Sequence, residues 1–150
     1  MNTRQDIQAF VAQKTVAVVG MSRAPRSFSV NAAKELKSKG YRIFPVNPNA
    51  TEIQGEKCYP SLGALPEKVG GALLVTPPAA TEKAVREAVE AGVPHLWIQQ
   101  GAESKEALAF CKEKNLSAVS GHCILMFAEP VGSFHRVHRW FKNLFQGLPK

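Results

Sequence analysis

The segment Thr15–Pro48 constrains the fold of this chain more than any other stretch of the sequence. It opens with Thr15–Val19, a short run of β-branched and small apolar residues that is typical of a strand buried on both faces of a parallel sheet. Gly20 ends that run, and a loop then leads into a stretch of helical apolar spacing that stops at Gly40. A second strand-forming run, Tyr41–Val46, follows. This order of strand, glycine turn, helix and strand predicts a βαβ unit with a right-handed crossover.

The remainder of the chain repeats this alternation of strand and helix. Further strands are expected at 71–76, 93–98 and 116–119, and further helices at 3–12, 79–91, 104–114 and 131–146. Strands that alternate with helices indicate an α/β fold with a doubly wound, parallel, five-stranded sheet of the Rossmann-like kind. We predict a single domain over residues 1–150, with its core at 14–123 and a C-terminal helix at 131–146. The strand order is predicted to be 3-2-1-4-5, counting strands along the chain.

The predicted sheet also predicts where a ligand binds. Ligands of such sheets lie beyond the carboxyl ends of the strands, at the point where the strand order reverses. In the predicted order the first and fourth strands flank this point. Four turns should converge there, at 20–28, 47–48, 76–78 and 99–102.

The turn after the first strand has the features of a phosphate site. Gly20-Met21-Ser22 precedes a helix that either Ser27 or Ser29 caps. Free backbone N–H groups and the helix dipole favour an anion at such a position. The dinucleotide fingerprint G-x-G-x-x-G needs glycine where Ser22 stands, and Asn47 replaces the acid that would bind a ribose hydroxyl. The sequence therefore predicts a phosphate site and disfavours NAD.

Five segments, taken together and in this order, carry a resemblance to a known family: Val18–Ser22, Gly40–Pro48, Ile53–Lys57, Tyr59–Leu62 and Trp97–Ala102. They are similar to segments of the small CoA-binding proteins, which are single Rossmann-like domains related to the N-terminal domain of the succinyl-CoA synthetase alpha subunit. The likeness runs from Val16 to Cys123. It implies binding of coenzyme A and gives no support for ligase chemistry. We therefore predict a stand-alone, non-catalytic module that binds coenzyme A or an acyl-CoA.

The resemblance also implies roles for the turns. Ser22 is expected at the nucleotide end of CoA, and the Asn47-Pro48 turn near the adenosine. The backbone N–H groups of the Gln99-Gln100-Gly101 turn are expected to meet the pantetheine arm or a phosphate. Arg23 and Arg26 either pair with a phosphate or are simply exposed arginines. The predicted cofactor-binding residues are Gly20, Met21, Ser22, Arg23, Arg26, Ser27, Asn47, Pro48, Thr76, Pro77, Pro78, Gln99, Gln100 and Gly101.

One of these turns departs from the family. The small CoA-binding proteins often have a Phe-Arg-Arg-like segment where this chain has Thr76-Pro77-Pro78. The synthetase alpha domain has a proline-containing segment against the CoA at this place. A basic contact expected from the nearer relatives is therefore missing here, which affects how the phosphates are held.

The composition of the chain limits which binding partners and which cellular compartment are expected. The net charge of +7 is compatible with nucleic acid or with a small polyanion. The basic residues are scattered, which favours a solvated surface and argues against a nucleic-acid partner. No apolar run could span a bilayer, and the N-terminus lacks the apolar core of a signal peptide. The three cysteines, Cys58, Cys111 and Cys123, show no paired spacing, so we expect a reduced, cytoplasmic protein.

Three other functions are weighed: a nicotinamide-dependent oxidoreductase, acyl transfer on Cys123, and nucleic-acid binding. His122 precedes Cys123, but adjacent residues of an extended chain point in opposite directions, so His122 is badly placed to activate the thiol. His135 and His138 have the spacing of metal ligands on a helix, yet a third ligand is missing and arginines are adjacent. No catalytic and no metal-binding residue is predicted. A homo-oligomer or a protein partner is left open.

Overall fold

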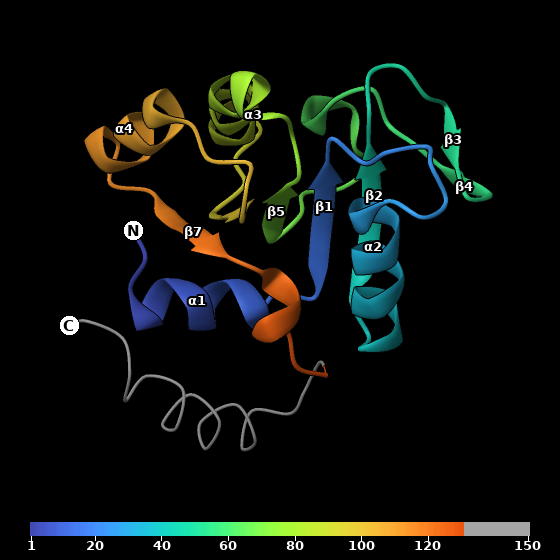
Figure 1. Cartoon of the computed structure of the whole chain (residues 1–150), viewed down its shortest axis with the longest axis horizontal. Coiled ribbons are helices and arrows are strands. Elements are labelled where there is room, and N and C mark those ends of the chain that lie inside the picture. The colour runs from blue at the N-terminus through green and yellow to red at the C-terminus, as the bar shows by residue number, and fades with distance from the viewer. Residues whose placement is uncertain (131–150) are drawn as a thin grey trace.

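Five parallel strands form the centre of the structure, a computed structural model that describes residues 1–130 (Figure 1). Their order in the sheet is β2-β1-β5-β6-β7. The bounds are β1 Thr15–Val19, β2 Arg42–Val46, β5 Gly71–Leu74, β6 His95–Gln99 and β7 Ser117–His122. All five predicted strands are present, which confirms the predicted fold class; the first has the predicted bounds, and the ends of the others differ by up to three residues. The predicted helix at 131–146 lies outside the described residues.

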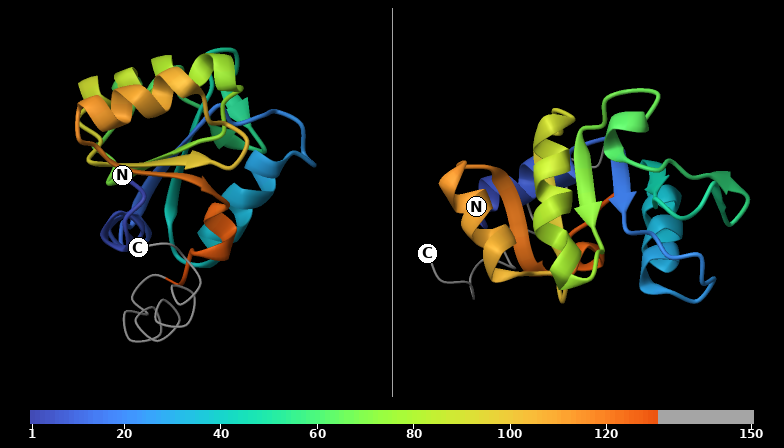
Figure 2. Two further views of the ribbon diagram at one scale, coloured as in Figure 1. Left: turned by 60° about the vertical axis from the view of Figure 1, so that its left-hand side comes forward. Right: turned by 90° about the horizontal axis from the view of Figure 1, so that it is seen from above.

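Helices cover both faces of the sheet (Figure 2). Helices α1 (Arg4–Val11) and α2 (Phe28–Ser38) pack on one face, and α3 (Pro78–Glu90) and α4 (Lys105–Glu113) pack on the other. The short 3-10 helix η2 (Ile124–Met126) lies beside α2. Each face has its own apolar core, and successive strand residues alternate between the two, because side chains of a strand point to opposite sides. None of the helices described within residues 1–130 has the length and apolar character that a bilayer span requires.

The predicted strand order is wrong. Counted along the chain, the observed order is 2-1-3-4-5, because β5 pairs with β1 and does not lie outside β2. The residue opposite Val18 on one side is Pro45, and on the other side it is Leu73. The outer side of β2 is occupied by Tyr59, whose N–H donates to Pro45 O at 3.0 Å. The strand order therefore reverses between β1 and β5, and not between the first and fourth strands.

The connection from β2 to β5 leaves the sheet and returns. It contains a two-stranded hairpin of β3 (Glu52–Ile53) and β4 (Glu56–Lys57), followed by the 3-10 helix η1 (Leu62–Ala64). In Figure 1 the hairpin lies away from the ends of β1 and β5. At the opposite edge of the sheet, the N–H of Asn2 donates to Ala118 O on β7 at 2.8 Å. Both edge strands thus have neighbours outside the sheet.

Candidate cofactor-binding site

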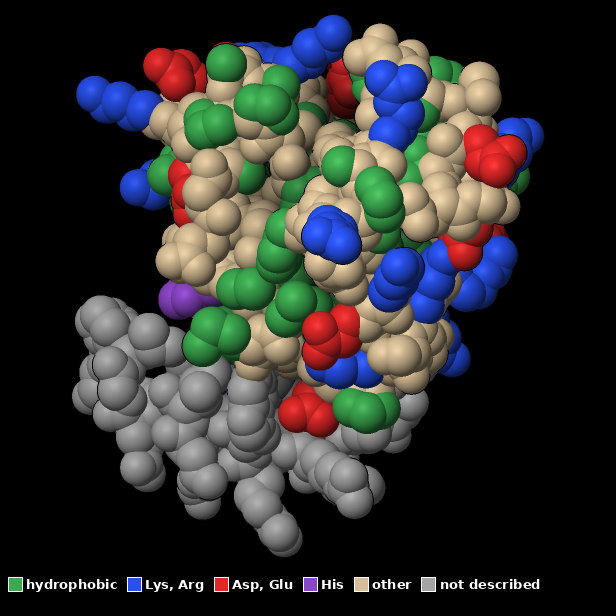
Figure 3. Space-filling view, turned by 45° about the vertical axis from the view of Figure 1, so that its right-hand side comes forward, with side chains coloured by type: hydrophobic (Ala, Val, Ile, Leu, Met, Phe, Trp, Pro, Cys, Tyr) green, Lys and Arg blue, Asp and Glu red, His purple; other side chains and the backbone are tan. Residues whose placement is uncertain are grey.

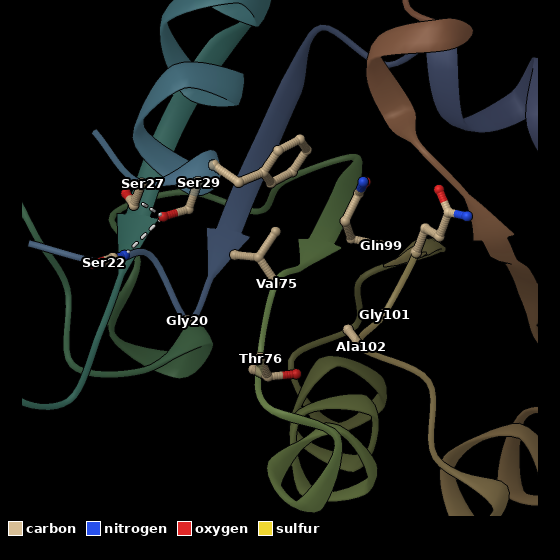
Figure 4. Close-up of a pocket in the computed structure, with 11 residues that line it drawn as sticks. Gly20, Ser22, Ser27, Ser29, Val75, Thr76, Gln99, Gly101 and Ala102 are labelled. Atoms are coloured by element: carbon tan, nitrogen blue, oxygen red, sulfur yellow. Dashed lines mark hydrogen bonds between the residues drawn. The ribbon is translucent and has the colours of Figure 1, made fainter. Parts of the chain in front are cut away.

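A cavity of about 390 Å³ lies at the carboxyl ends of β1, β5 and β6, where the strand order reverses. We name its two sides by the helices that follow them: the α2 rim comprises residues 20–29, and the α4 rim comprises residues 99–103. The turn after β5 forms the floor between the two rims (Figure 4). The residues that line the cavity are Gly20, Ser22, Ser27, Phe28, Ser29, Val75, Thr76, Gln99, Gln100, Gly101 and Ala102.

Gly20 allows the α2 rim to meet the floor. Its φ of +85° lies in the left-handed region, which favours glycine. A Cβ at this position would lie 3.0 Å from Thr76 Cγ2 and 3.2 Å from the Thr76 backbone. The Gly20 N–H donates to Val46 O at 3.0 Å, which turns the chain away from β1 and toward α2. Glycine is thus required both by the turn and by the close approach of β5.

Serine side chains shape the α2 rim. Ser29 Oγ accepts a hydrogen bond from the N–H of Ser22 at 2.9 Å, and Ser27 Oγ lies 3.2 Å from Ser29 Oγ (Figure 4). Ser27 Oγ also accepts from the N–H of Val30 at 3.3 Å, so Ser27 is the N-cap of α2. Ser22 Oγ accepts from the N–H of Ala24 at 3.0 Å, which leaves the hydroxyl hydrogen of Ser22 available.

The first turn of α2 presents unpaired donors to the cavity. The backbone N–H groups of Phe28 and Ser29 have no acceptor among residues 1–130. They lie at the positive end of an 11-residue helix, where partial charges favour an anion. Arg23 and Arg26 are exposed on the loop that leads to this turn. The α2 rim is therefore suited to a phosphate.

The α4 rim differs because its backbone donors already have acceptors. The N–H of Gln100 donates to His122 O at 3.2 Å, and that of Ala102 donates to Gln99 O at 2.8 Å. The N–H of Gly101 donates to the carboxylate of Glu103 at 2.7 Å. The expected contact of this turn with a phosphate or the pantetheine arm stays a prediction; its N–H groups at 100–102 already have acceptors within the chain, although residues 99–102 line the cavity.

A buried hydroxyl pair links the floor to the α4 rim. Thr81, on α3, is fully buried, and its Oγ1 lies 2.6 Å from both Thr76 Oγ1 and Ala102 O. Because a carbonyl oxygen can only accept, Thr81 donates to a carbonyl and Thr76 donates to Thr81. Sequence reasoning did not single out Thr81. The signal was a polar residue on the apolar face of the helix expected at 79–91.

The structure brings half of the predicted cofactor-binding residues to the cavity and places the rest around it. Those that line the cavity are Gly20, Ser22, Ser27, Thr76, Gln99, Gln100 and Gly101. Those that do not are Met21, Arg23, Arg26, Asn47, Pro48, Pro77 and Pro78. Phe28, Ser29, Val75 and Ala102 line it without having been predicted as cofactor-binding residues. They lie in or next to three of the four predicted turns, whereas the turn at 47–48 contributes no residue to the lining.

Three of the residues away from the cavity have structural roles. Met21 is buried in the core on the α2 side of the sheet. Asn47 Nδ2 donates to Met21 O at 2.9 Å, and Asn47 Oδ1 accepts from the N–H of Asn49 at 2.8 Å, so this side chain holds the turn after β2. Pro78 occupies the first position of α3, where the missing N–H costs nothing.

The cysteines lie apart from the cavity lining. Burial raises the pKa of the Cys58 and Cys111 thiols, which makes both poor nucleophiles. Cys123 is half-buried at the end of β7 and does not line the cavity. No group of His, Cys, Asp or Glu side chains within the described part of the chain could hold a metal ion.

A doubly wound sheet, a cavity at the reversal of strand order and an open helix N-terminus define a Rossmann-like domain suited to a phosphate-bearing cofactor. Within that class, the chain belongs to the CoA binding domain family, which matches residues 14–129. The resemblance to CoA-binding domains seen in the sequence is thereby confirmed.

Two relatives illustrate the range of this family. ADP-forming acetate–CoA ligase II of Archaeoglobus fulgidus is 33% identical over 106 residues, which is 69% of this chain and 16% of the ligase. The uncharacterized protein YneT of Bacillus subtilis is 32% identical over 111 residues, which is 74% of this chain and 82% of that protein. The chain thus spans about a sixth of the ligase but most of the Bacillus protein.

Solved structures show the same fold at similar size. A conserved hypothetical protein from Pyrococcus furiosus is 41% identical, with a TM-score of 0.71 over 75% of this chain and 97% of that chain. A hypothetical protein from Pyrococcus horikoshii is 32% identical, with a TM-score of 0.76 over 83% of this chain and 88% of that chain.

Proposed function

We propose that the protein binds coenzyme A or an acyl-CoA in the cavity between the α2 and α4 rims, as a module without catalysis of its own. The observation that carries this proposal is the open first turn of α2. There the unpaired N–H groups of Phe28 and Ser29 and the free hydroxyl hydrogen of Ser22 meet at one side of the cavity. Membership of the CoA binding domain family supports CoA as the phosphate-bearing ligand.

The two rims suggest how CoA would be oriented. Its phosphates would lie at the α2 rim, where the helix dipole and the nearby Arg23 and Arg26 favour negative charge. The uncharged parts would lie over Phe28 and Val75 and extend toward the α4 rim. The carboxylate of Glu103 at that rim would repel a phosphate and so favours the same orientation.

The other functions weighed from the sequence gain less support. For NAD, Asn47 would have to bind a ribose hydroxyl, but its side chain is engaged within the turn after β2. For acyl transfer, Cys123 would have to face the bound thioester, yet it does not line the cavity. For nucleic acid, the basic residues should gather in a patch, whereas Lys and Arg intermingle with Asp and Glu on the face that Figure 3 shows.

Calorimetric titration with CoA, dephospho-CoA and NAD tests the proposal. We expect CoA to bind, dephospho-CoA to bind more weakly, and NAD to give no saturable heat. Substitution Ser22→Tyr should fill the α2 rim and weaken CoA binding by at least about tenfold, or ~1.4 kcal/mol. Ser38→Tyr is the matched control, because Ser38 is exposed at the far end of α2. Saturable NAD binding without a response to CoA would overturn the proposal.

A further inference from the structure

Gln99 ends β6 and holds its side-chain amide in one orientation. Its Oε1 accepts a hydrogen bond from the backbone N–H of Ile124 at 3.1 Å. A backbone N–H can only donate, so the oxygen must face Ile124 and the amide nitrogen must point away from it. Ile124 is 1% exposed and packs in the core beside Trp97, so this anchor is fixed.

The amide nitrogen of Gln99 is a donor without an acceptor inside the protein. The residue is 7% exposed, and no atom of residues 1–130 accepts a hydrogen bond from its Nε2. Gln99 lines the cavity from the end of β6 (Figure 4). Within residues 1–130, no side-chain nitrogen or oxygen closed off from solvent lacks a hydrogen-bond partner, so this nitrogen is open to the cavity and available to an acceptor on a bound molecule.

The surroundings of the nitrogen define what kind of acceptor it is. Phe28 and Val75 line the cavity beside Gln99 and are apolar. The anion-binding groups lie at the first turn of α2, whereas Glu103 places a carboxylate at the rim to which Gln99 belongs. A phosphate would therefore be repelled at this rim, and an uncharged oxygen or nitrogen within an apolar group would be accepted.

We propose that Gln99 Nε2 is a specificity-determining donor that binds an uncharged acceptor in the non-phosphate part of the ligand. This rests on the proposed binding of CoA, in which two groups have that chemistry: an amide carbonyl of the pantetheine arm and a ring nitrogen of adenine. Ile124 is the positioning residue, because its N–H prevents the amide from turning its oxygen toward the ligand.

The variant Gln99→Glu tests the donor directly. A carboxylate can still accept from Ile124 N–H, but its second oxygen would repel the ligand acceptor. We expect CoA affinity to fall by about tenfold or more at about pH 8, relative to the unaltered protein at the same pH. At about pH 5 the loss should shrink, because part of the carboxyl is then protonated and the protonated acid donates as the amide did. Gln5→Glu, on the exposed surface of α1, controls for the added charge.

Two fragments distinguish the sources of the acceptor. The compound 4′-phosphopantetheine lacks adenine, and adenosine 3′,5′-bisphosphate lacks the pantetheine arm. A pH-dependent loss of affinity in Gln99→Glu for the first fragment identifies the arm, and the same loss for the second identifies adenine. Either result supports the proposal. A loss of the same size at both pH values, or no loss for CoA, overturns it.

A second measurement covers the case in which Gln99→Glu does not fold. In a 15N–1H spectrum of the unaltered protein, the Gln99 side-chain amide protons should move downfield when CoA is added. Amide protons that do not move while backbone signals at 28–29 do move would overturn the role of Gln99 and leave CoA binding intact. If CoA moves no signal at all, both the proposed function and this inference fail.

Discussion

The α2 rim and the α4 rim each connect a strand of the sheet to a serine-capped helix. Ser27 accepts from the N–H of Val30 at 3.3 Å, and Ser104 accepts from the N–H of Ala107 at 3.1 Å. In the α2 rim the first turn of the helix itself lines the cavity, with its N–H groups at 28 and 29 unpaired. Helix α4 begins beyond the residues that line the cavity. The N–H groups of the turn before it, at 100–102, donate hydrogen bonds to acceptors within the protein.

This difference shows that a turn after a parallel strand is not by itself an anion site. Both rims stand at the carboxyl edge of the sheet, where ligands of this fold bind. Of the two rims, within residues 1–130, only the α2 rim retains free backbone N–H groups in the cavity lining that a phosphate could use, whereas in the α4 rim Glu103 places a carboxylate against the backbone of Gly101. The two rims therefore suit different parts of a ligand: the α2 rim suits a negatively charged group, and the α4 rim suits an uncharged one.

The largest expected effect compares a glycine from each rim. Gly20 and Gly101 both have positive φ, at +85° and +94°, so alanine is strained at either position. Only Gly20 also has a neighbour in the way, the Thr76 backbone at 3.2 Å from a built Cβ. We expect Gly20→Ala to lower the free energy of unfolding by about 2–4 kcal/mol and Gly101→Ala by about 1 kcal/mol. Denaturant unfolding measures both, and equal losses would contradict the steric argument.

The next effect concerns the hydrogen bonds by which Thr81 of α3 holds the α4 rim and the floor together. Thr81→Val keeps the shape of the side chain but removes the hydroxyl that bonds Ala102 O and receives the Thr76 hydroxyl. Leaving these buried groups unpaired should cost about 1–3 kcal/mol of unfolding free energy. Thr51→Val, at an exposed position, is the control and should change little. Both variants are measured by denaturant unfolding, and similar unfolding midpoints would show that the hydroxyl pair does not stabilise the rim.

A smaller effect concerns charge at the α2 rim. Replacing Arg23 and Arg26 together by Gln should weaken CoA binding by about tenfold at low ionic strength and by less as salt rises. The control replaces Lys105 and Lys112 by Gln, which removes the same charge from exposed positions of α4, the helix that follows the other rim. Titration of both variants should show the loss only in the first. Equal losses would indicate a general effect of net charge.

The smallest expected effect concerns the negative charge of Glu103 at the α4 rim. Glu103→Gln removes a negative charge but keeps an oxygen to accept from the N–H of Gly101. CoA should then bind about twofold to threefold more tightly, because a weak repulsion of its phosphates is lost. Glu113→Gln, at the far end of α4, should leave the affinity unchanged. Weaker binding in Glu103→Gln would mean that the carboxylate contacts the ligand.

Local patterns were sufficient to predict the five strands of the main sheet and helices α1 to α4, but neither the β3–β4 hairpin nor the order of the strands. Thr15–Val19 and Gly71–Leu74 are both short apolar runs buried on two faces, and nothing in either run encodes its neighbour. The order depends on contacts between distant residues, such as Tyr59 with Pro45. A partner at a separation of this kind cannot be read from the periodicity of one segment.

The same reason explains which parts of the site were predicted. Gly20 and Ser22 belong to a turn whose conformation and helix cap are local, and the sequence indicated their place. The N–H groups at 100–102 donate to acceptors within the protein. One of these acceptors is His122 O, which lies near Gln100 only once the sheet has folded. Asn47 was expected near the ligand from the family resemblance, whereas its side-chain hydrogen bond to Met21 O joins two separate turns and cannot be read from the sequence.

The occupied sheet edges limit how other chains can join this one. Tyr59 pairs with the outer side of β2, whose Pro45 has no N–H to offer, and Asn2 bonds the backbone of β7 at Ala118 and Ser120. Within residues 1–130, neither edge presents an uninterrupted row of free peptide groups for an incoming strand. Continuous sheets across two copies, and fibres built by strand addition, are therefore disfavoured. A second copy or a partner protein has to approach through helix surfaces or loops, and association through those surfaces leaves the sheet unchanged.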